Sequence, residues 1–174
     1  MKAPFDFVIE PKGNRYNNTT KIGDTDIKAG DTVIVHHNVF RRWYNVKGVE
    51  KNSKSYFNES TYMITSDQIF LYKRDNEWKT PKGYCFVQPI KDRVYLGVDK
   101  EESCIGIVKH TDGSYKKGDL VGFTPFSTYE FIIDSKRLYR VMTQFITIKY
   151  EYQGNEEEYN PSWAESSRGI NQSS

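Results

Sequence analysis

Residues 40–54 combine aromatic and cationic side chains in a pattern that can bind single-stranded nucleic acid, because bases stack on rings while cations meet phosphates. The formal net charge of the whole chain is only +2, which argues against a nucleic-acid partner. We therefore interpret the segment as a solvated hairpin tip with rings packed on its own unit, or alternatively as an oligomer contact. Its side chains are Phe40, Arg41, Arg42, Trp43, Tyr44, Lys47, Lys51 and Lys54.

Two further groups have ligand or nucleophile chemistry, but neither forms a recognisable site. His36 and His37 could bind a metal ion, yet neighbouring residues of a strand point to opposite faces, so both cannot easily reach one ion. Cys85 lies between Tyr84 and Phe86, which indicates a buried sheet thiol rather than a nucleophile. The sequence has no P-loop, Gly-x-Ser-x-Gly or His-Glu-x-x-His motif. We therefore expect no enzyme activity, no metal and no cofactor.

The composition predicts an all-β protein. Aromatic residues make up 15% of the 174 residues, with 13 Tyr and 10 Phe, and such side chains suit a half-buried pleated sheet. No apolar run approaches the roughly 18 residues of a membrane span, and the N-terminus lacks the apolar region of a signal peptide. With no secretory signal, we expect Cys85 and Cys104 to be two buried free thiols, and we expect a cytoplasmic location, in the host cytoplasm if the protein is viral.

Two segments recur in the same order, which predicts one small β unit built twice. Residues 27–33 (IKAGDTV) match residues 115–121 (YKKGDLV), and residues 62–71 match residues 139–148 more loosely. The spacing between matched segments is 11 residues longer in the first copy, since 39 positions separate its glycine from its isoleucine against 28 in the second. We assign this extra length to a longer hairpin within residues 41–58.

Turn residues and strand patterns place the boundaries of the two copies. We expect a first unit at residues 1–76, a linker with proline and glycine at residues 77–83, and a second unit at residues 84–152. Residues 153–174 are acidic and then rich in Ser, Asn and Gly, which predicts a disordered tail.

The strand expected at residues 68–73 carries two aromatic side chains that the second copy replaces with polar ones. If Ile69 and Leu71 face the core, then Phe70 and Tyr72 face outward. An exposed aromatic strand indicates a protein interface. The alternative is that the other unit covers this strand.

Several short motifs resemble GroES-type co-chaperonins, and their order is the same in both copies. In the first copy, Gly-Asn-Arg at residues 13–15 precedes Lys-Ala-Gly-Asp-Thr-Val at residues 28–33. The family has a Gly-Asn-Gly-Arg-like turn and then a Lys-x-Gly-Asp-x-Val turn. Residues 62–69 (YMITSDQI) are similar to the family's closing segment. The second copy matches through residues 106–108, 117–121, 129–134 and 139–148.

This resemblance implies two tandem GroES-like small β-barrels followed by the disordered tail. It also implies a non-enzymatic co-chaperonin that forms homo-oligomers, caps a GroEL-like chaperonin ring and assists protein folding, with ATP used by the chaperonin. Family members dock through a long loop after their first strand, for which the first copy has no room. In the second copy, the resemblance points to Ile105 and Ile107 as the chaperonin-binding residues, beside the available space at residues 97–103. Alternatively, Ile105-Gly106-Ile107 is simply part of the next strand.

A second class of function fits the same sequence. The chain could be a structural or assembly protein, for example of a virus particle such as a phage, that uses the barrel as an interaction module. A co-chaperonin should slow ATP turnover by its chaperonin and form discrete rings. A structural module should do neither, and should co-purify with a particle.

Overall fold

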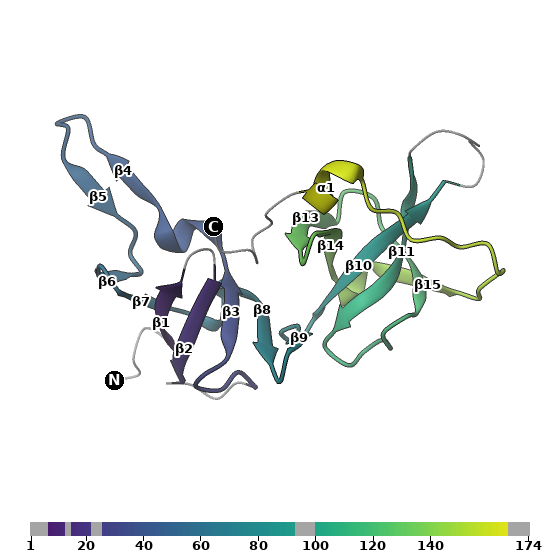
Figure 1. Ribbon diagram of the computed structural model, residues 1–174, viewed down its shortest axis with the longest axis horizontal. Helices are drawn as coiled ribbons and strands as arrows, with labels where there is room; N and C mark the ends of the chain where they lie inside the picture. Colours follow the sequence, from purple (N-terminus) through teal and green to yellow (C-terminus); the bar gives the residue numbers. More distant parts are fainter. Residues whose placement is uncertain (1–6, 13–14, 22–25, 93–99, 167–174) are drawn as a thin grey trace. The chain divides into compact units, whose positions relative to one another are not determined.

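The chain divides into two compact units, the first ending at Pro81 and the second beginning at Lys82. Both consist mainly of antiparallel strands (Figure 1), which confirms the predicted β-rich class. Part of the space predicted at residues 97–103 lies outside the described residues. In this computed structural model, the described residues are 7–12, 15–21, 26–92 and 100–166.

Unit 1 contains a seven-stranded sheet with the order β6-β7-β1-β2-β3-β8-β9. A separate two-stranded sheet, β4 (Arg42–Tyr44) and β5 (Glu50–Asn52), is inserted between β3 and β6 along the chain. Two 3-10 turns, η1 (His37–Phe40) and η2 (Ser66–Gln68), follow β3 and β7. The strands of the large sheet are β1 (Phe7–Lys12), β2 (Arg15–Lys21), β3 (Thr32–Val35), β6 (Tyr56–Asn58), β7 (Thr61–Ile64), β8 (Ile69–Arg74) and β9 (Glu77–Lys79).

Unit 2 contains a six-stranded sheet with the order β13-β14-β10-β11-β12-β15. A 3-10 turn, η3 (Thr143–Phe145), precedes its last strand, and a short helix, α1 (Ser162–Ser166), follows the sheet. The strands are β10 (Tyr84–Lys91), β11 (Glu101–Thr111), β12 (Leu120–Phe123), β13 (Thr128–Ile133), β14 (Lys136–Met142) and β15 (Ile146–Tyr150).

Corresponding strands occupy corresponding places in the two sheets. Leaving out β9, the order β6-β7-β1-β2-β3-β8 matches β13-β14-β10-β11-β12-β15 position by position. The β3–β8 and β12–β15 ladders each contain an irregular step in register. The sequence repeat is therefore also a repeat of topology. Among the described residues, no ladder joins the two edge strands of either sheet, so closure into a barrel stays a prediction.

The Gly-Asp turns that precede β3 and β12 have the same hydrogen bonds. In unit 1, the Asp31 carboxylate accepts from the backbone amide of Lys28 at 2.8 Å. In unit 2, the Asp119 carboxylate accepts from the backbone amide of Lys116 at 3.0 Å. Each aspartate amide donates back to the lysine carbonyl, at 3.2 and 3.1 Å. The glycine before each aspartate has φ of 91°, a left-handed conformation that glycine adopts without steric cost.

Each unit has its own apolar core, because alternate side chains of its strands face the same side of the sheet. In unit 1, Phe7, Ile9 and Ile64 are fully buried in the main cluster. Unit 2 has a main cluster that includes Cys85, Val87, Val108, Val121 and Val141, and a smaller one of Ile90, Ile107 and Leu120.

The predicted disordered tail is wrong for residues 153–166, which pack against unit 2. Pairing between β14 and β10 ends at Val87, and beyond that point the tail pairs with β10 instead. The Lys91 amide donates to the Glu157 carbonyl at 2.8 Å, and the Tyr159 amide donates to the Pro89 carbonyl at 2.7 Å. The tail orders because it satisfies backbone groups of β10 and buries the Tyr159 ring.

The predicted linker at residues 77–83 is also wrong in part, since its first three residues form β9. Asp75 and Asn76 adopt positive φ values of 51° and 61°, which suit the tight turn of a β-hairpin. The turn returns the chain along β8 and buries Trp78. Unit 1 therefore extends beyond residue 76, to Pro81.

Candidate protein-interaction surfaces

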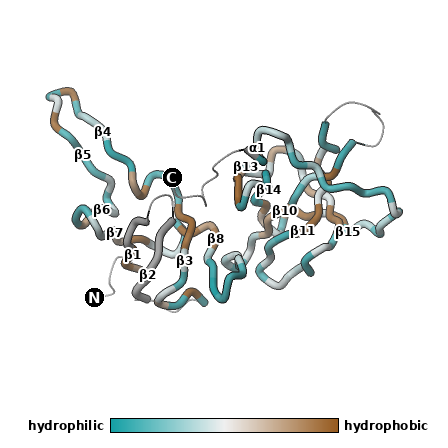
Figure 2. Tube along the Cα trace, viewed as in Figure 1, coloured by the Kyte–Doolittle hydropathy of each residue, from teal (hydrophilic) through white to brown (hydrophobic). Residues whose placement is uncertain are grey.

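The β4–β5 hairpin projects away from the sheet of unit 1 (Figure 1). This confirms a hairpin at the place of the extra length in the first copy. Figure 2 shows hydrophobic positions toward the far end of the hairpin, between more hydrophilic arms. Four apolar side chains are exposed along it, with exposed fractions of 42% for Trp43, 72% for Tyr44, 104% for Val46 and 50% for Val49.

The hairpin turn is fixed by its own hydrogen bonds. The Asn45 side-chain oxygen accepts from the amides of Lys47 and Val49, at 2.9 and 3.0 Å. The Gly48 amide donates to the Asn45 carbonyl at 2.9 Å, and Gly48 has φ of 73°. A turn held in this way presents Val46 without a large loss of chain entropy on binding.

The two faces of the hairpin differ in charge. On one face, the Arg42 guanidinium lies 2.9 Å from the Glu59 carboxylate and 3.8 Å from Glu50. Its hydrogen bond lowers the pKa of Glu59. On the other face, Trp43 lies directly opposite Lys51, and the Arg41 guanidinium lies 5.4 Å from the Trp43 ring centroid. The prediction of an exposed hairpin with aromatic and cationic side chains is therefore confirmed. The prediction that its rings pack on the unit is wrong for Trp43 and Tyr44, which are exposed.

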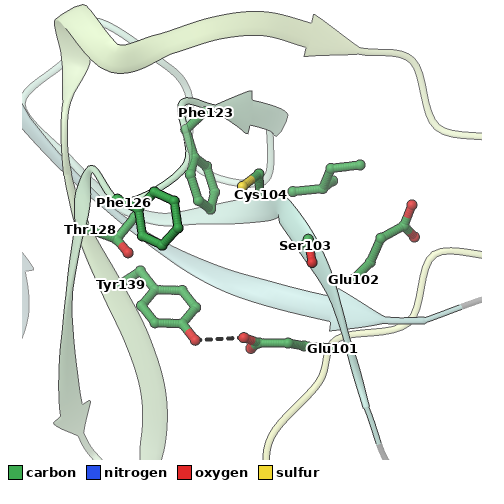
Figure 3. Close-up of a pocket in the computed structure, with 9 residues that line it drawn as sticks. Glu101, Glu102, Ser103, Cys104, Phe123, Phe126, Thr128 and Tyr139 are labelled. Carbon is green, nitrogen blue, oxygen red and sulfur yellow. Dashed lines mark hydrogen bonds between the residues drawn. The ribbon is translucent and has the colours of Figure 1, made fainter.

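Unit 2 has an aromatic cleft of about 180 Å³ between β11 and the β12–β13 connection. Figure 3 shows the rings of Phe123, Phe126 and Tyr139 on one side and the carboxylates of Glu101 and Glu102 on the other. The Tyr139 hydroxyl donates to Glu101 at 2.6 Å. Burial and this hydrogen bond raise the pKa of Tyr139 well above its usual range, so the ring stays neutral.

Phe126 occupies an unusual position at the rim of the aromatic cleft. Its ring is fully exposed, with an exposed fraction of 105%, and its backbone φ is 61°. A bulky residue in the left-handed region is a conformational outlier, and such outliers concentrate at functional sites. We therefore treat Phe126 as a candidate contact residue.

A second cleft of about 260 Å³, the acidic cleft, lies next to the first and shares Glu102 and Ile105 with it. Its apolar side chains are Ile105, Leu120 and Tyr150. The Glu156 carboxylate accepts the amides of residues 153, 154 and 155, at 2.7, 2.9 and 3.1 Å, which shapes this wall of the cleft. The remaining lining residues are Glu102, Glu151, Gln153 and Glu156.

The structure separates the two residues predicted to bind a chaperonin. Both lie within β11, which pairs with β10 and β12, so they do not form a docking loop. Ile107 is buried in the small core cluster and is unavailable to a partner, whereas Ile105 is half-buried and lines the acidic cleft. The prediction is wrong for Ile107 because its side chain packs with Ile90 and Leu120, whereas Ile105, on the same face of the strand, is only partly covered.

The predicted outward pair on β8 is not exposed as a pair. Tyr72 is buried in the core of unit 1, with an exposed fraction of 6%, and Phe70 is half-buried beside His36. The register step in the β3–β8 ladder interrupts strict alternation, so Ile69 and Tyr72 both join the main cluster. An interface at Tyr72 is therefore excluded in the folded unit.

The histidines and Cys85 have structural roles. His36 and His37 stack with ring centroids 4.3 Å apart, because the chain leaves the strand there, and the expected opposite orientation is wrong. The His36 Nδ1 accepts the Asn38 amide at 3.1 Å and caps η1. Burial raises the pKa of Cys85, whose thiol contacts the Thr111 hydroxyl at 3.7 Å.

Within the described residues, no cluster of three or more His, Cys, Asp or Glu side chains has a geometry that could hold a metal ion. The helical part of the same residues contains no segment with the length and hydropathy needed to cross a bilayer.

Sequence reasoning missed Val46, Val49, Phe126 and the acidic cleft. Val46 and Val49 have a signal in the sequence, since apolar residues within a short polar hairpin have no core to join. Phe126 in Thr-Pro-Phe-Ser resembles any loop aromatic, and its exposure depends on the backbone conformation. The acidic cleft brings together residues from β11, β12 and the segment after β15, which only the fold reveals.

Comparison with known proteins gives no family assignment, since no family model matches the chain and no curated protein matches it. The GroES resemblance therefore stays a prediction based on the short motifs.

Proposed function

We propose that this chain is a non-enzymatic, co-chaperonin-like protein that forms a homo-oligomer, caps a chaperonin ring and assists protein folding. In this proposal each unit is a diverged GroES-like barrel, and the chaperonin supplies the ATP chemistry. The observation that carries the proposal is the Gly-Asp turn, which contains the residues of the resemblance and has the same hydrogen bonds in both units. The common strand order of the two sheets supports the same reading.

The contact with the chaperonin needs a new assignment, since Ile107 is in the core. We assign it to Phe126, a fully exposed aromatic ring beside the aromatic cleft. Aromatic anchors of this kind dominate the energy of many protein interfaces. Residues 93–99, between β10 and β11, lie outside the described residues and carry no part of this assignment.

The test is the native mass of the chain with a GroEL-like chaperonin, with and without nucleotide. The proposal expects a discrete complex of fixed stoichiometry and slower ATP turnover by the chaperonin. Phe126→Ser should weaken the complex at least about tenfold, whereas Phe57→Ser, a matched change at an exposed phenylalanine of unit 1, should not. Wild-type chain that neither binds the ring nor slows its ATP turnover would exclude the proposal.

A second candidate, a structural or assembly protein, is favoured by the projecting hairpin with its fixed turn and exposed valines. Such an element suits a permanent contact in a particle as well as a contact in a ring. This function predicts co-purification with a particle and unchanged chaperonin ATP turnover.

A further inference from the structure

The β4–β5 hairpin of unit 1 and the acidic cleft of unit 2 are complementary in charge and in polarity. Residues 41–54 contain five cationic side chains and one carboxylate, a local net charge of +4. Residues 151–158 contain four glutamates and no cation; Glu157 and Glu158 are paired with Lys91 and Lys109, and Glu151 and Glu156 line the cleft. Two regions of one chain therefore carry opposite charge, although the whole chain carries only +2.

The hairpin offers an apolar tip with free cations around it. Val46 is fully exposed, and Lys47 and Lys51 are exposed and form no ion pair within the described part of the chain. Arg42 differs, because it is already paired with Glu59 and Glu50 on the other face. The cationic side of the hairpin is therefore the side that carries Trp43 and Lys51.

The acidic cleft has matching properties. Ile105 and Tyr150 supply apolar surface above the buried Leu120, and Glu151 supplies an exposed carboxylate. Its volume, about 260 Å³, is below the roughly 300–1,000 Å³ of small-molecule sites, which favours one side chain of a protein as the occupant. A valine followed by a lysine fits such a cleft, with the methyl groups on the apolar floor and the ammonium group at the carboxylate.

We propose that the hairpin tip of one copy docks in the acidic cleft of a second copy. Val46 enters the cleft against Ile105 and Tyr150, and Lys47 pairs with Glu151. Because the contact joins two different surfaces, each copy offers a free hairpin and a free cleft to further copies. Such head-to-tail contacts close into rings or extend into filaments, according to the rotation between copies. The contact concerns self-assembly and does not depend on chaperonin binding.

The direct test places a photo-activated cross-linker at position 46 of the full-length chain and irradiates a mixture of ¹⁴N- and ¹⁵N-labelled protein. We expect mixed-isotope cross-links between position 46 and peptides that contain residues 102–105 or 150–156. Cross-links to other surfaces only, or between residues of the same copy only, would overturn the proposal.

A charge-reversal series gives an independent readout of the same contact by sedimentation velocity, without a chaperonin. Lys47→Glu and Glu151→Lys should each weaken self-association at least about tenfold, and the double variant should recover most of the loss. Lys136→Glu, which makes the same charge change at the exposed first residue of β14, is the matched control and should leave assembly unchanged. A monomeric wild-type chain at 100 µM, or a double variant as weak as either single variant, would contradict the proposal. Self-assembly without chaperonin binding would exclude only the proposed function.

Discussion

The two units share a strand order but differ sharply in one connection. In unit 2, four residues, Thr124–Ser127, lead from β12 to β13. In unit 1, the equivalent connection from β3 to β6 contains η1 and the whole β4–β5 hairpin. Both connections expose an apolar side chain, Val46 in the first and Phe126 in the second. A repeated scaffold thus positions two different exposed apolar side chains on its connections, as is common for loops on a rigid framework.

A second difference lies in the charge pairs that hold the common turn. Asp31 is buried and receives two hydrogen bonds from Arg74, at 3.0 Å from Nε and 2.5 Å from Nη2. Asp119 is more exposed and pairs with Lys149 at 3.2 Å. The same turn is therefore stabilised by a largely buried bidentate Arg74–Asp31 pair in unit 1 and by a more exposed Lys149–Asp119 pair in unit 2.

The largest expected effect on stability is at Gly106, a position where unit 2 requires glycine and unit 1 does not. A side chain at Gly106 would place its Cβ 2.9 Å from the Gln88 carbonyl oxygen, which is fixed backbone. Unit 1 has Tyr16 at the same register position, opposite Val33, as Gly106 lies opposite Val121. Gly106→Val should lower the free energy of unfolding by about 3 kcal/mol, measured by chemical denaturation.

Ser103→Val in the exposed part of β11 is the control for this change, and it should cost less than about 0.5 kcal/mol. Equal stability of the two variants would show that the close approach of β10 and β11 is not a constraint.

A smaller effect sharpens the comparison of the two turns. Asp31→Ala should cost about 2–3 kcal/mol, since it leaves the Arg74 guanidinium and the Lys28 amide without their carboxylate. Asp119→Ala should cost about 1 kcal/mol, because its pair with Lys149 is closer to solvent. The measurement is the difference in unfolding free energy between the two variants. Asp119→Ala as costly as Asp31→Ala would contradict the difference drawn between the units.

The smallest expected effect is a loss of folding stability at acidic pH, which comes from two carboxyl groups of unit 2. Burial opposes the charged form of Asp112, but the amides of Ser114 and Gly83 outweigh it and lower the pKa of this carboxyl. The pKa of Asp119 is also lowered, since the Lys116 amide and the Lys149 ammonium outweigh its burial. A carboxyl with a lowered pKa stabilises the fold above about pH 4 and loses this contribution as the pH falls through its folded-state value.

The measurement is the unfolding free energy between pH 6 and pH 2 for the wild type and for Asp112→Asn. The variant should show a shallower loss of stability below about pH 4. If the unfolding free energy of the variant falls with pH as steeply as that of the wild type, Asp112 does not contribute to the acid dependence.

The repeat and its extra hairpin were predictable because they depend on local order in the sequence. The Lys-x-Gly-Asp turns have the same chemistry in both copies, and the offset of 11 residues identified the region of the hairpin. The ordered tail was not predictable, because residues 157–159 read as polar and become ordered only through pairing with β10. Likewise, the burial of Tyr72 depends on a register step, and Ile107 points inward because of its place in the β11 ladder.

We propose that the β4–β5 hairpin serves assembly while the repeated sheets carry the fold. The most direct measurement replaces residues 42–52 with Asn-Gly, which gives unit 1 a short connection like that of unit 2, and then compares native mass and unfolding free energy with the wild type. The account predicts loss of the higher assembly with a change in unfolding free energy below about 1 kcal/mol, since the removed residues are mostly exposed. Unchanged assembly, or a unit 1 that no longer folds, would contradict it.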